Sequence, residues 1–208
     1  GLRRLEYRGY DSAGISVLTN GSLNRRRAEG KLFNLERDIK DNPLAGNIGI
    51  GHTRWATHGP PNLINSHPHV SGPVSIVHNG IIENHKEIRD ELMLTGYIMQ
   101  TDTDTEVVAH LAKRCLDEGM KPNEMMQFII GRVSGAYAFV IMIADYPGIL
   151  MIARRSSPLV IGYGDEKMFV GSDTLALAPM TRRVCYLEDG DWAIISQNGA
   201  TIYDSENI

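Results

Sequence analysis

The longest apolar run of the chain, residues 136–144, has the length of a β-strand and shows no alternation of apolar and polar side chains. A strand with a single buried face alternates, so this run predicts a strand that is covered on both faces. Residues 74–77 lack the alternation as well and receive the same interpretation. Two such strands need further layers on both sides of their sheet, which favours a layered fold of strands and helices.

Helical periodicity appears near the amino end and again in the middle of the chain. Residues 31–40 carry apolar side chains with helical spacing and predict a short amphipathic helix. Residues 84–87 and 103–106 each have the spacing of a capping box and precede an apolar stripe, which predicts two more helices. A proline opens the last predicted helix, at residues 122–131.

The remaining apolar segments predict strands that are separated by short turns. They are residues 12–18, 48–54, 74–79, 136–144, 149–154, 168–172, 191–196 and 201–203. The strands come in runs and the helices cluster in the middle, so we expect antiparallel sheets sandwiched by helices and no βαβ repeat. No glycine-rich phosphate-binding pattern follows any of these strands.

Composition argues against several classes of function. A net charge of -4 at pH 7 and the lack of a long Lys/Arg stretch argue against a nucleic-acid binder. No apolar segment approaches the roughly 20 residues that span a bilayer, so we expect no membrane association. Two cysteines suit a reducing cytoplasm. We expect one domain over residues 1–208 and, because the chain begins with Gly1 and not with Met, a piece of something longer.

Six of the seven histidines lie between His52 and His85. His67 and His69, which flank Pro68, raise the alternative of a zinc site, because imidazole is a common zinc ligand. The segment contains no HExxH pattern and no paired cysteines. We therefore favour hydrogen-bonded loop histidines and expect neither a metal nor a cofactor.

The dipeptide Asn79-Gly80 lies between two apolar runs and has two compatible interpretations. Asn-Gly is a strong signal for the turn of a β-hairpin, which is the structural prediction. The functional prediction is an oxyanion hole, in which the Asn79 side-chain amide and the Gly80 backbone N–H point out of the turn and donate to a tetrahedral intermediate.

Charged side chains elsewhere could hold a substrate that carries both charges. Arg54 ends a predicted strand, where we expect an exposed guanidinium that binds a carboxylate, with an ordinary surface arginine as the alternative. Trp55 beside it is a large ring that needs a surface to pack on. Asp104 lies in the first turn of a predicted helix and either serves the helix dipole or binds an ammonium group. Arg54 and Asp104 on one cavity would fit an amino acid.

The residues alone offer no convincing nucleophile. Cys115 lies on the apolar stripe of a predicted helix, and Cys185 fits an ordinary strand. Ser12 and Ser172 stand in no GxSxG context. The sequence therefore predicts binding groups and an oxyanion hole without a group that attacks.

A family resemblance extends along nearly the whole chain and is carried by seven short motifs. They are residues 5–14 (LEYRGYDSAG), 52–59 (HTRWATHG), 65–70 (NSHPHV), 78–84 (HNGIIEN), 101–106 (TDTDTE), 155–162 (RSSPLVIG) and 171–173 (GSD). In this order they resemble the glutaminase domain of the glucosamine-6-phosphate synthase family, the isomerising glutamine-fructose-6-phosphate aminotransferases. The phosphoribosyl-pyrophosphate amidotransferase type is the nearest alternative, but its corresponding loop lacks the Trp-Ala-Thr-His-Gly run and the His-Pro-His.

The resemblance implies an α+β fold, a four-layer α/β/β/α sandwich of the N-terminal-nucleophile hydrolase type, lacking its amino-terminal part. It implies hydrolysis of glutamine to glutamate and ammonia, and transfer of the ammonia to fructose-6-phosphate by an isomerase domain of the same full-length chain. A cytoplasmic homo-oligomer is the expected form of the full-length enzyme.

The resemblance also implies roles for individual residues. Arg54 would bind the α-carboxylate of glutamine and Asp104 its α-ammonium. The catalytic residues would be Asn79 and Gly80 at the oxyanion and Arg8 beside the nucleophilic terminus. The rest of the pocket would be formed by Trp55 in the loop that closes over glutamine, Thr57, His58 and His67.

One departure from the family pattern concerns the nucleophile. In the family it is a cysteine at the mature amino terminus, whose free α-amino group acts as the general base. That cysteine would lie upstream of Gly1, and neither Cys115 nor Cys185 carries the terminal amine needed to replace it. We therefore expect these residues by themselves to recognise glutamine without hydrolysing it. The alternative from another class is a regulatory module that binds glutamine without catalysis.

Overall fold

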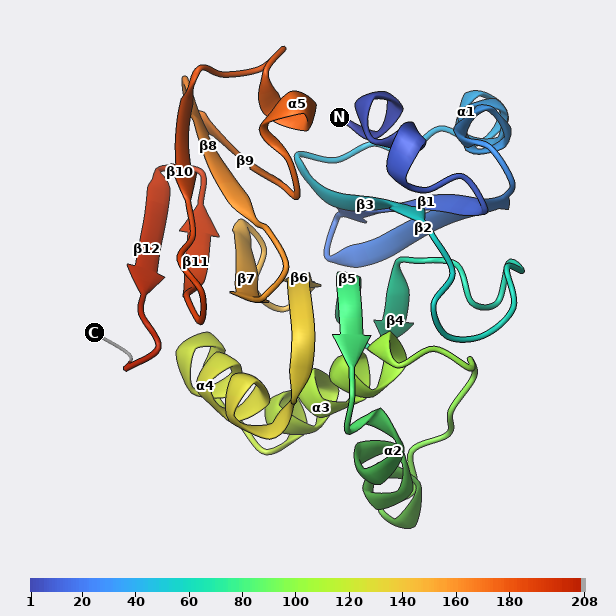
Figure 1. Ribbon diagram of the computed structural model, residues 1–208, viewed down its shortest axis with the longest axis vertical. Coiled ribbons are helices and arrows are strands. Elements are labelled where there is room, and N and C mark those ends of the chain that lie inside the picture. Colours follow the sequence, from blue (N-terminus) through green and yellow to red (C-terminus); the bar gives the residue numbers. More distant parts are fainter. Residues whose placement is uncertain (207–208) are drawn as a thin grey trace.

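A six-stranded antiparallel sheet forms the centre of the computed structural model, which describes residues 1–206 (Figure 1). Its strands follow the spatial order β12-β11-β7-β6-β5-β4. Their bounds are β4 (His69–Ser71), β5 (Val74–Ile82), β6 (Gly135–Ile143), β7 (Ile149–Arg155), β11 (Trp192–Ser196) and β12 (Gly199–Tyr203). Most side chains of β5 and β6 are buried, which confirms that these two strands are covered on both faces.

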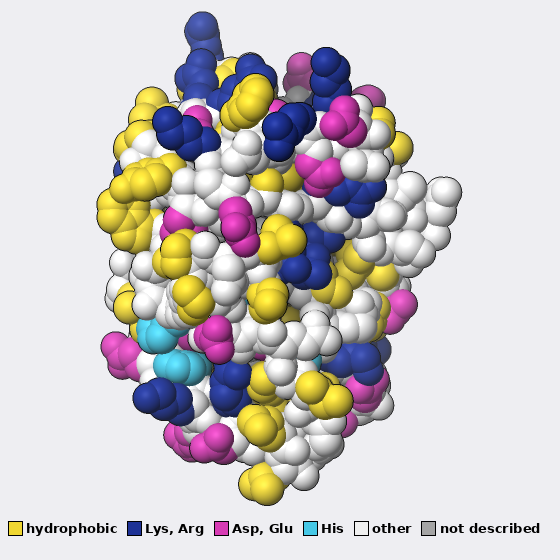
Figure 2. All heavy atoms as spheres, turned by 90° about the vertical axis from the view of Figure 1, so that its right-hand side faces the viewer, with side chains coloured by type: hydrophobic (Ala, Val, Ile, Leu, Met, Phe, Trp, Pro, Cys, Tyr) yellow, Lys and Arg dark blue, Asp and Glu magenta, His cyan; other side chains and the backbone are white. Residues whose placement is uncertain are grey.

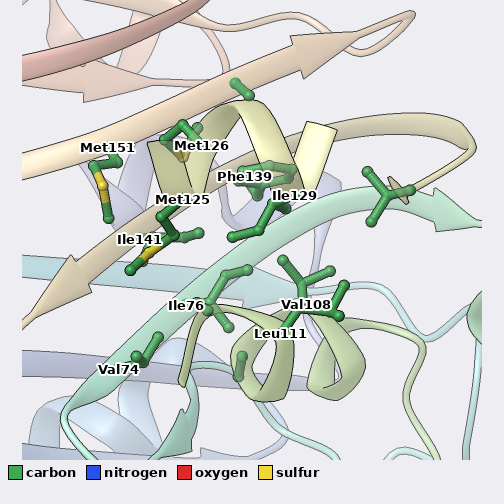
Figure 3. Packing of buried hydrophobic residues seen from close by; sticks show 14 of the residues in the cluster. Val74, Ile76, Val108, Leu111, Met125, Met126, Ile129, Phe139, Ile141 and Met151 are labelled. Carbon is green, nitrogen blue, oxygen red and sulfur yellow. The ribbon is translucent and has the colours of Figure 1, made fainter. Parts of the chain in front are cut away.

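Three helices cover one face of this sheet and lie together at the bottom of Figure 1. They are α2 (His85–Leu94), α3 (Thr105–Asp117) and α4 (Pro122–Arg132). Figure 3 shows Leu111 of α3 and Ile129 of α4 directed toward Ile76 of β5 and Phe139 of β6. These side chains are fully buried, so the hydrophobic effect holds the helices to the sheet.

Two smaller sheets lie on the other face. The first has the order β2-β1-β3 and the second has the order β10-β8-β9. Leu18 and Ile50 of the first, and Ile161 of the second, share one hydrophobic cluster with Val140 and Ile152 of the large sheet. The strands are β1 (Ser12–Thr19), β2 (Ser22–Glu29), β3 (Ile48–Arg54), β8 (Val160–Gly164), β9 (Lys167–Gly171) and β10 (Arg183–Tyr186). The two small sheets together form a second sheet layer.

An outer helical layer covers the small sheets (Figure 1). In the helix α1, Leu32 and Leu35 bury their side chains against Ala13 of β1. The other members are two short 3₁₀ turns near the amino end and the short helix α5. Their bounds are η1 (Leu2–Arg4), η2 (Glu6–Arg8), α1 (Leu32–Asp41) and α5 (Thr174–Leu177). The layer order is helix, sheet, sheet, helix, which confirms the predicted α/β/β/α sandwich.

Several local predictions need correction. The predicted helices are present within a few residues, but neither capping box at residues 84–87 or 103–106 forms. Instead, Asn84 bonds to the backbone of Arg132 and Ser134, which lie outside its own helix. The strands β2, β4 and β8 were not predicted. The side chains of β2 are mostly half-buried and include three consecutive arginines, so the strand shows no apolar alternation.

The predicted hairpin turn at Asn79-Gly80 is wrong. β5 continues through both residues to Ile82, in register with β6, where Gly80 pairs with Tyr137. Continued pairing across the sheet outweighs the local turn preference of Asn-Gly, because β6 supplies ladder partners for the whole segment. The two residues therefore project from a central strand and not from a turn.

The surface shows charges of both signs. Figure 2 shows Lys and Arg side chains interspersed with Asp and Glu side chains on one face of the molecule. No helix within residues 1–206 is long and apolar enough to cross a membrane.

Candidate active site

A cavity of about 790 Å³ is lined by residues of all three sheets. Its wall includes residues 49–54 of β3 and residues 168–171 of β9, and both strands are edges of their sheets. All nine residues predicted for the site line this cavity: Arg8, Arg54, Trp55, Thr57, His58, His67, Asn79, Gly80 and Asp104. The fold therefore gathers into one place residues that come from five separate segments of the sequence.

Arg54, the last residue of β3, is buried, although the sequence predicted an exposed guanidinium. Its Nη2 donates to the carbonyl oxygens of His58 at 2.6 Å and Gly59 at 3.2 Å, and its Nη1 donates to that of Pro60 at 3.2 Å. A carboxylate oxygen of Asp11 lies 3.9 Å from Nη1. The loop after β3 thus folds back over Arg54, which buries the side chain and leaves part of its donor set free.

Asp104 is buried in the cavity wall at the N-cap position of α3. Its Oδ2 accepts a hydrogen bond of 2.7 Å from the backbone N–H of Ile82. The Nδ1 atoms of His58 and His78 each lie 4.0 Å from one of its carboxylate oxygens. Arg54 and Asp104 face one cavity, so the site presents a fixed positive group and a fixed negative group to whatever enters.

Asn79 and Gly80 reach the same cavity from β5. The Oδ1 of Asn79 lies 2.8 Å from Nε2 of His52, and its side-chain nitrogen makes no hydrogen bond to residues 1–206. Gly80 has a φ of 122°, and a Cβ at this position would overlap with the carbonyl oxygen of Ala136. Glycine is therefore required here, and the Asn79 amide is left as an unused donor at the cavity wall.

Four histidines form a continuous group at the cavity wall, where three of them line the cavity: His52, His67 and His78. The rings of His52 and His67 stack with centroids 4.4 Å apart, and His67 meets His69 edge-on at 4.6 Å. Burial lowers the pKa of His52 to about 4, that of His69 to about 3 and that of His78 to about 4, and it lowers the pKa of His67 well below 6.5. All four imidazoles are therefore neutral at pH 7. Within residues 1–206, no cluster of His, Cys, Asp and Glu is arranged to hold a metal ion.

The other predicted residues lie toward the mouth of the cavity. Arg8 is half-exposed, and its Nη2 lies 2.9 Å from a carboxylate oxygen of Asp173, so it links the amino-terminal segment to the start of α5. Trp55 is 61% exposed, and its ring meets Tyr10 edge-on at 5.5 Å. The expectation that Trp55 packs on a surface is therefore met by one aromatic contact only. Thr57 is exposed.

Two further residues that were not singled out from the sequence hold the loop after β3. The carboxylate of Asp11 accepts a hydrogen bond from the backbone N–H of Ala56. Asn65 is buried, donates to the carbonyl oxygen of Pro60 at 3.1 Å, and accepts from the backbone N–H of Asp102 at 2.9 Å. Both lie in motifs that carried the family resemblance, so the motifs could have identified them.

Neither cysteine reaches the cavity. Cys115 is buried among the helices and the large sheet, where desolvation raises the pKa of its thiol to about 11. Cys185 is a free thiol on β10 and does not line the cavity. Within the described part of the chain, the cavity therefore holds groups that bind and polarise, without a cysteine that could attack.

Comparison with known proteins gives a consistent family assignment. Residues 63–179 match a family model described as a glutamine amidotransferase domain. The isomerizing glutamine-fructose-6-phosphate aminotransferase of Mesorhizobium japonicum is 56% identical over 203 residues, which are 98% of this chain and 33% of that protein. The protein of the same name from Zymomonas mobilis is 52% identical over 207 residues, 100% of this chain and 34% of that protein. This chain thus spans about a third of the length of these curated relatives.

Solved structures show the same architecture. The glutamine phosphoribosylpyrophosphate amidotransferase of B. subtilis superimposes with a TM-score of 0.82 at 28% identity, over 98% of this chain and 45% of that chain. A glutamine aminotransferase class-II domain protein from Silicibacter pomeroyi superimposes with a TM-score of 0.65 at 15% identity, over 94% and 96% of the two chains. At that identity the second likeness concerns the fold alone.

Proposed function

We propose, from the premise that this chain belongs to the glutamine amidotransferase domain family, that it is the glutamine-binding part of a glutaminase. Its fold is that of the N-terminal-nucleophile amidotransferases. The observation that carries the proposal is the arrangement of Arg54 and Asp104, two buried groups of opposite charge that face one cavity beside Asn79 and Gly80. An α-amino acid with a side-chain amide has the complementary groups.

Each end of glutamine has a counterpart in the cavity. Arg54 binds the α-carboxylate with the N–H groups that its loop carbonyls leave free. Asp104 binds the α-ammonium through its opposite charge. The backbone N–H of Ile82 holds the carboxylate in place. Thr57 and His58 complete the pocket on the side of the loop, and His67 forms part of its wall. With both ends fixed, the side-chain amide is oriented for attack.

Catalysis uses a cysteine that precedes Gly1 in the longer protein. Its thiolate attacks the amide carbon of glutamine, and the N–H groups of Asn79 and Gly80 stabilise the oxyanion. The terminal α-amine takes the proton of the cysteine thiol and delivers it to the amide nitrogen, so that the C–N bond breaks and ammonia leaves. Water then hydrolyses the thioester, which gives glutamate and restores the thiol. Arg8 positions the nucleophilic terminus.

The two edge strands support this placement of the preceding segment. Among residues 1–206, β3 and β9 each pair with a strand on one side only, and both strands line the cavity. An extended segment between them pairs with both edges and joins the two small sheets into one layer. Such a segment enters the cavity within reach of Arg8 and Asn79, which is where the nucleophile must lie.

In the longer protein, the ammonia goes to fructose-6-phosphate. This acceptor follows from the names of the relatives that are 52% and 56% identical to this chain, whereas the phosphoribosylpyrophosphate enzyme is 28% identical. The domain over residues 1–208 then works with an isomerase domain of its own chain in a cytoplasmic homo-oligomer, and it binds neither nucleic acid nor membrane. The chemistry of the glutaminase step needs no cofactor.

The test measures glutaminase activity of the full-length protein and of its variants. We expect Arg54→Lys and Asp104→Asn to raise KM for glutamine at least about tenfold, a loss of about 1.4 kcal/mol in binding. Arg37→Ala and Asp41→Asn change exposed residues outside this cavity and serve as matched controls with unchanged kinetics. An unchanged KM in both site variants contradicts the assigned roles. Glutamine binding without ammonia release by the full-length protein points to the regulatory module.

A further inference from the structure

His52 makes a direct contact with the residue proposed to bind the oxyanion. Its Nε2 lies 2.8 Å from the Oδ1 of Asn79, which brings β3 and β5 together at the cavity wall. The roles proposed above for the charge pair and the oxyanion hole do not yet include this histidine. The contact nevertheless controls which end of the Asn79 amide faces the cavity, because an amide has a donor end and an acceptor end.

The protonation of His52 decides the orientation. The imidazole is neutral at pH 7, because burial lowers its pKa to about 4, and it therefore carries one N–H. Its Nδ1 is buried without a hydrogen-bond partner among residues 1–206. The Oδ1 of a side-chain amide can only accept, so the proton belongs on Nε2, where it donates to Asn79 Oδ1 at 2.8 Å.

The position of the His52 ring is itself fixed. The ring stacks on His67 at 4.4 Å with an interplanar angle of 20°. His67 in turn accepts the backbone N–H of His78 on Nδ1 at 3.3 Å, and it meets His69, whose Nε2 lies 3.2 Å from the hydroxyl of Thr103. The stack leaves His52 little freedom to rotate away from Asn79.

We infer that His52 is a positioning residue that orients the Asn79 amide, with its oxygen held by the imidazole and its NH₂ group presented to the reacting amide of glutamine. The inference rests on the proposed function and adds to it the residue that prepares the oxyanion hole. Without His52, the Asn79 side chain is free to turn its oxygen toward the cavity. An oxygen in that place repels the developing oxyanion, so the effect falls on the transition state and not on substrate binding.

The test uses the full-length protein with two substitutions of different donor capacity. His52→Leu removes the N–H, whereas His52→Gln retains an amide N–H that can donate to Asn79. We expect His52→Leu to lower kcat by about 10²-fold, as removal of an oxyanion donor does, with KM for glutamine within about threefold of the wild type. His52→Gln should recover at least about tenfold of that loss in kcat, which a purely packing role would not explain.

A double-mutant cycle and a spectroscopic measurement complete the test. In the Asn79→Ala background, His52→Leu should change kcat less than about twofold, because the group that it orients is gone. Histidine-selective ¹⁵N NMR should show the Nε2–H tautomer of His52. Thermal unfolding of each variant identifies a loss of fold.

Distinct outcomes overturn the two proposals. An unchanged kcat in His52→Leu, additive losses in the double mutant or an Nδ1–H tautomer each overturn the inference about His52. If wild-type protein hydrolyses glutamine and Asn79→Ala does not, while His52→Leu remains active, the proposed function stands and only the inference fails. If the full-length wild type releases no ammonia from glutamine, the proposed function fails first.

Discussion

The two faces of the six-stranded sheet are built differently. The face toward α3 and α4 packs apolar side chains such as Phe139 and Ile141 against helices (Figure 3). The opposite face meets two small sheets and borders a cavity whose wall contains buried charges and neutral histidines. The first face is held by hydrophobic packing, whereas the second combines a hydrophobic cluster with polar groups that cost stability unless they are paired. One sheet thus carries a purely apolar layer on one face and the candidate site beside a second apolar cluster on the other.

The largest expected effect is a fall in the free energy of unfolding in acid, which the buried histidines on the cavity side would cause. The folded pKa values of His52, His69 and His78 are lowered from 6.5 to about 4, about 3 and about 4 by burial. Below pH 6.5 these histidines bind protons in the unfolded chain but remain neutral in the folded chain. The free energy of unfolding therefore falls as pH decreases toward these values. The slope approaches about 4 kcal/mol per pH unit for three groups.

Urea unfolding of the full-length protein between pH 8 and pH 4.5 measures this slope. We expect a plateau above pH 7 and cooperative loss of the domain between pH 6 and pH 4.5. A flat stability profile down to pH 4.5 would mean that the three imidazoles are accessible to protons in the folded state.

The next effect concerns the sheet face that packs against α3 and α4. Phe139→Ala should lower the free energy of unfolding by about 3–5 kcal/mol, because a fully buried ring leaves a cavity that the neighbouring helices cannot fill. KM for glutamine should stay within about twofold at a temperature where the variant is folded. A large change in KM in the folded variant would show that the two faces are not separate. Denaturation and kinetics on the same sample measure both quantities.

A smaller effect is expected at Gly80, where the backbone itself shapes the cavity. Gly80→Ala places a side chain at a φ of 122° and against the carbonyl oxygen of Ala136, so we expect a loss of about 2–3 kcal/mol together with loss of glutaminase activity. Gly148→Ala is the matched control, because its φ is 98° but no atom lies near its Cβ. The control should cost about 1 kcal/mol and leave activity unchanged. Equal losses of stability in both variants would mean that backbone strain alone explains the effect of Gly80→Ala.

The smallest effect on stability is expected at Trp55. The ring is 61% exposed and meets Tyr10 edge-on, so Trp55→Ala should change the free energy of unfolding by less than about 0.5 kcal/mol. If Trp55 closes over bound glutamine, the glutaminase activity of this variant should fall far more than its stability. A destabilisation above about 1 kcal/mol would instead make this residue part of the folded core, and chemical denaturation decides between the two.

Local patterns anticipated much of the fold. The uninterrupted apolar runs in β5 and β6 predicted strands covered on both faces, and helical spacing located α1 to α4 within a few residues. The sequence-based predictions were wrong where tertiary contacts override the local preference of a segment. β2 was missed because Arg25 and Arg27 bury their stems while donating to the loop carbonyls of Pro68 and Ser66, which no periodicity shows.

For the site, motifs identified the residues but not their environments. The sequence named Arg54 and described it as exposed, whereas the loop carbonyls of His58 and Gly59 enclose it. It placed Asn79 in a turn, whereas pairing with β6 keeps it in a strand. These differences arise from contacts between segments far apart in the chain, and such contacts have no local signature.

The sequence by itself determined the family, the layered architecture and the residue types of the site, because apolar spacing and short motifs are contained in short segments of the chain. Only the tertiary structure decided that Arg54 and Asp104 share one cavity, that the histidines are neutral, and that His52 holds the Asn79 amide. The physical reason is that burial, pKa and hydrogen-bond orientation depend on what the fold packs around a group. The chain's own order of residues does not contain that information in any one segment.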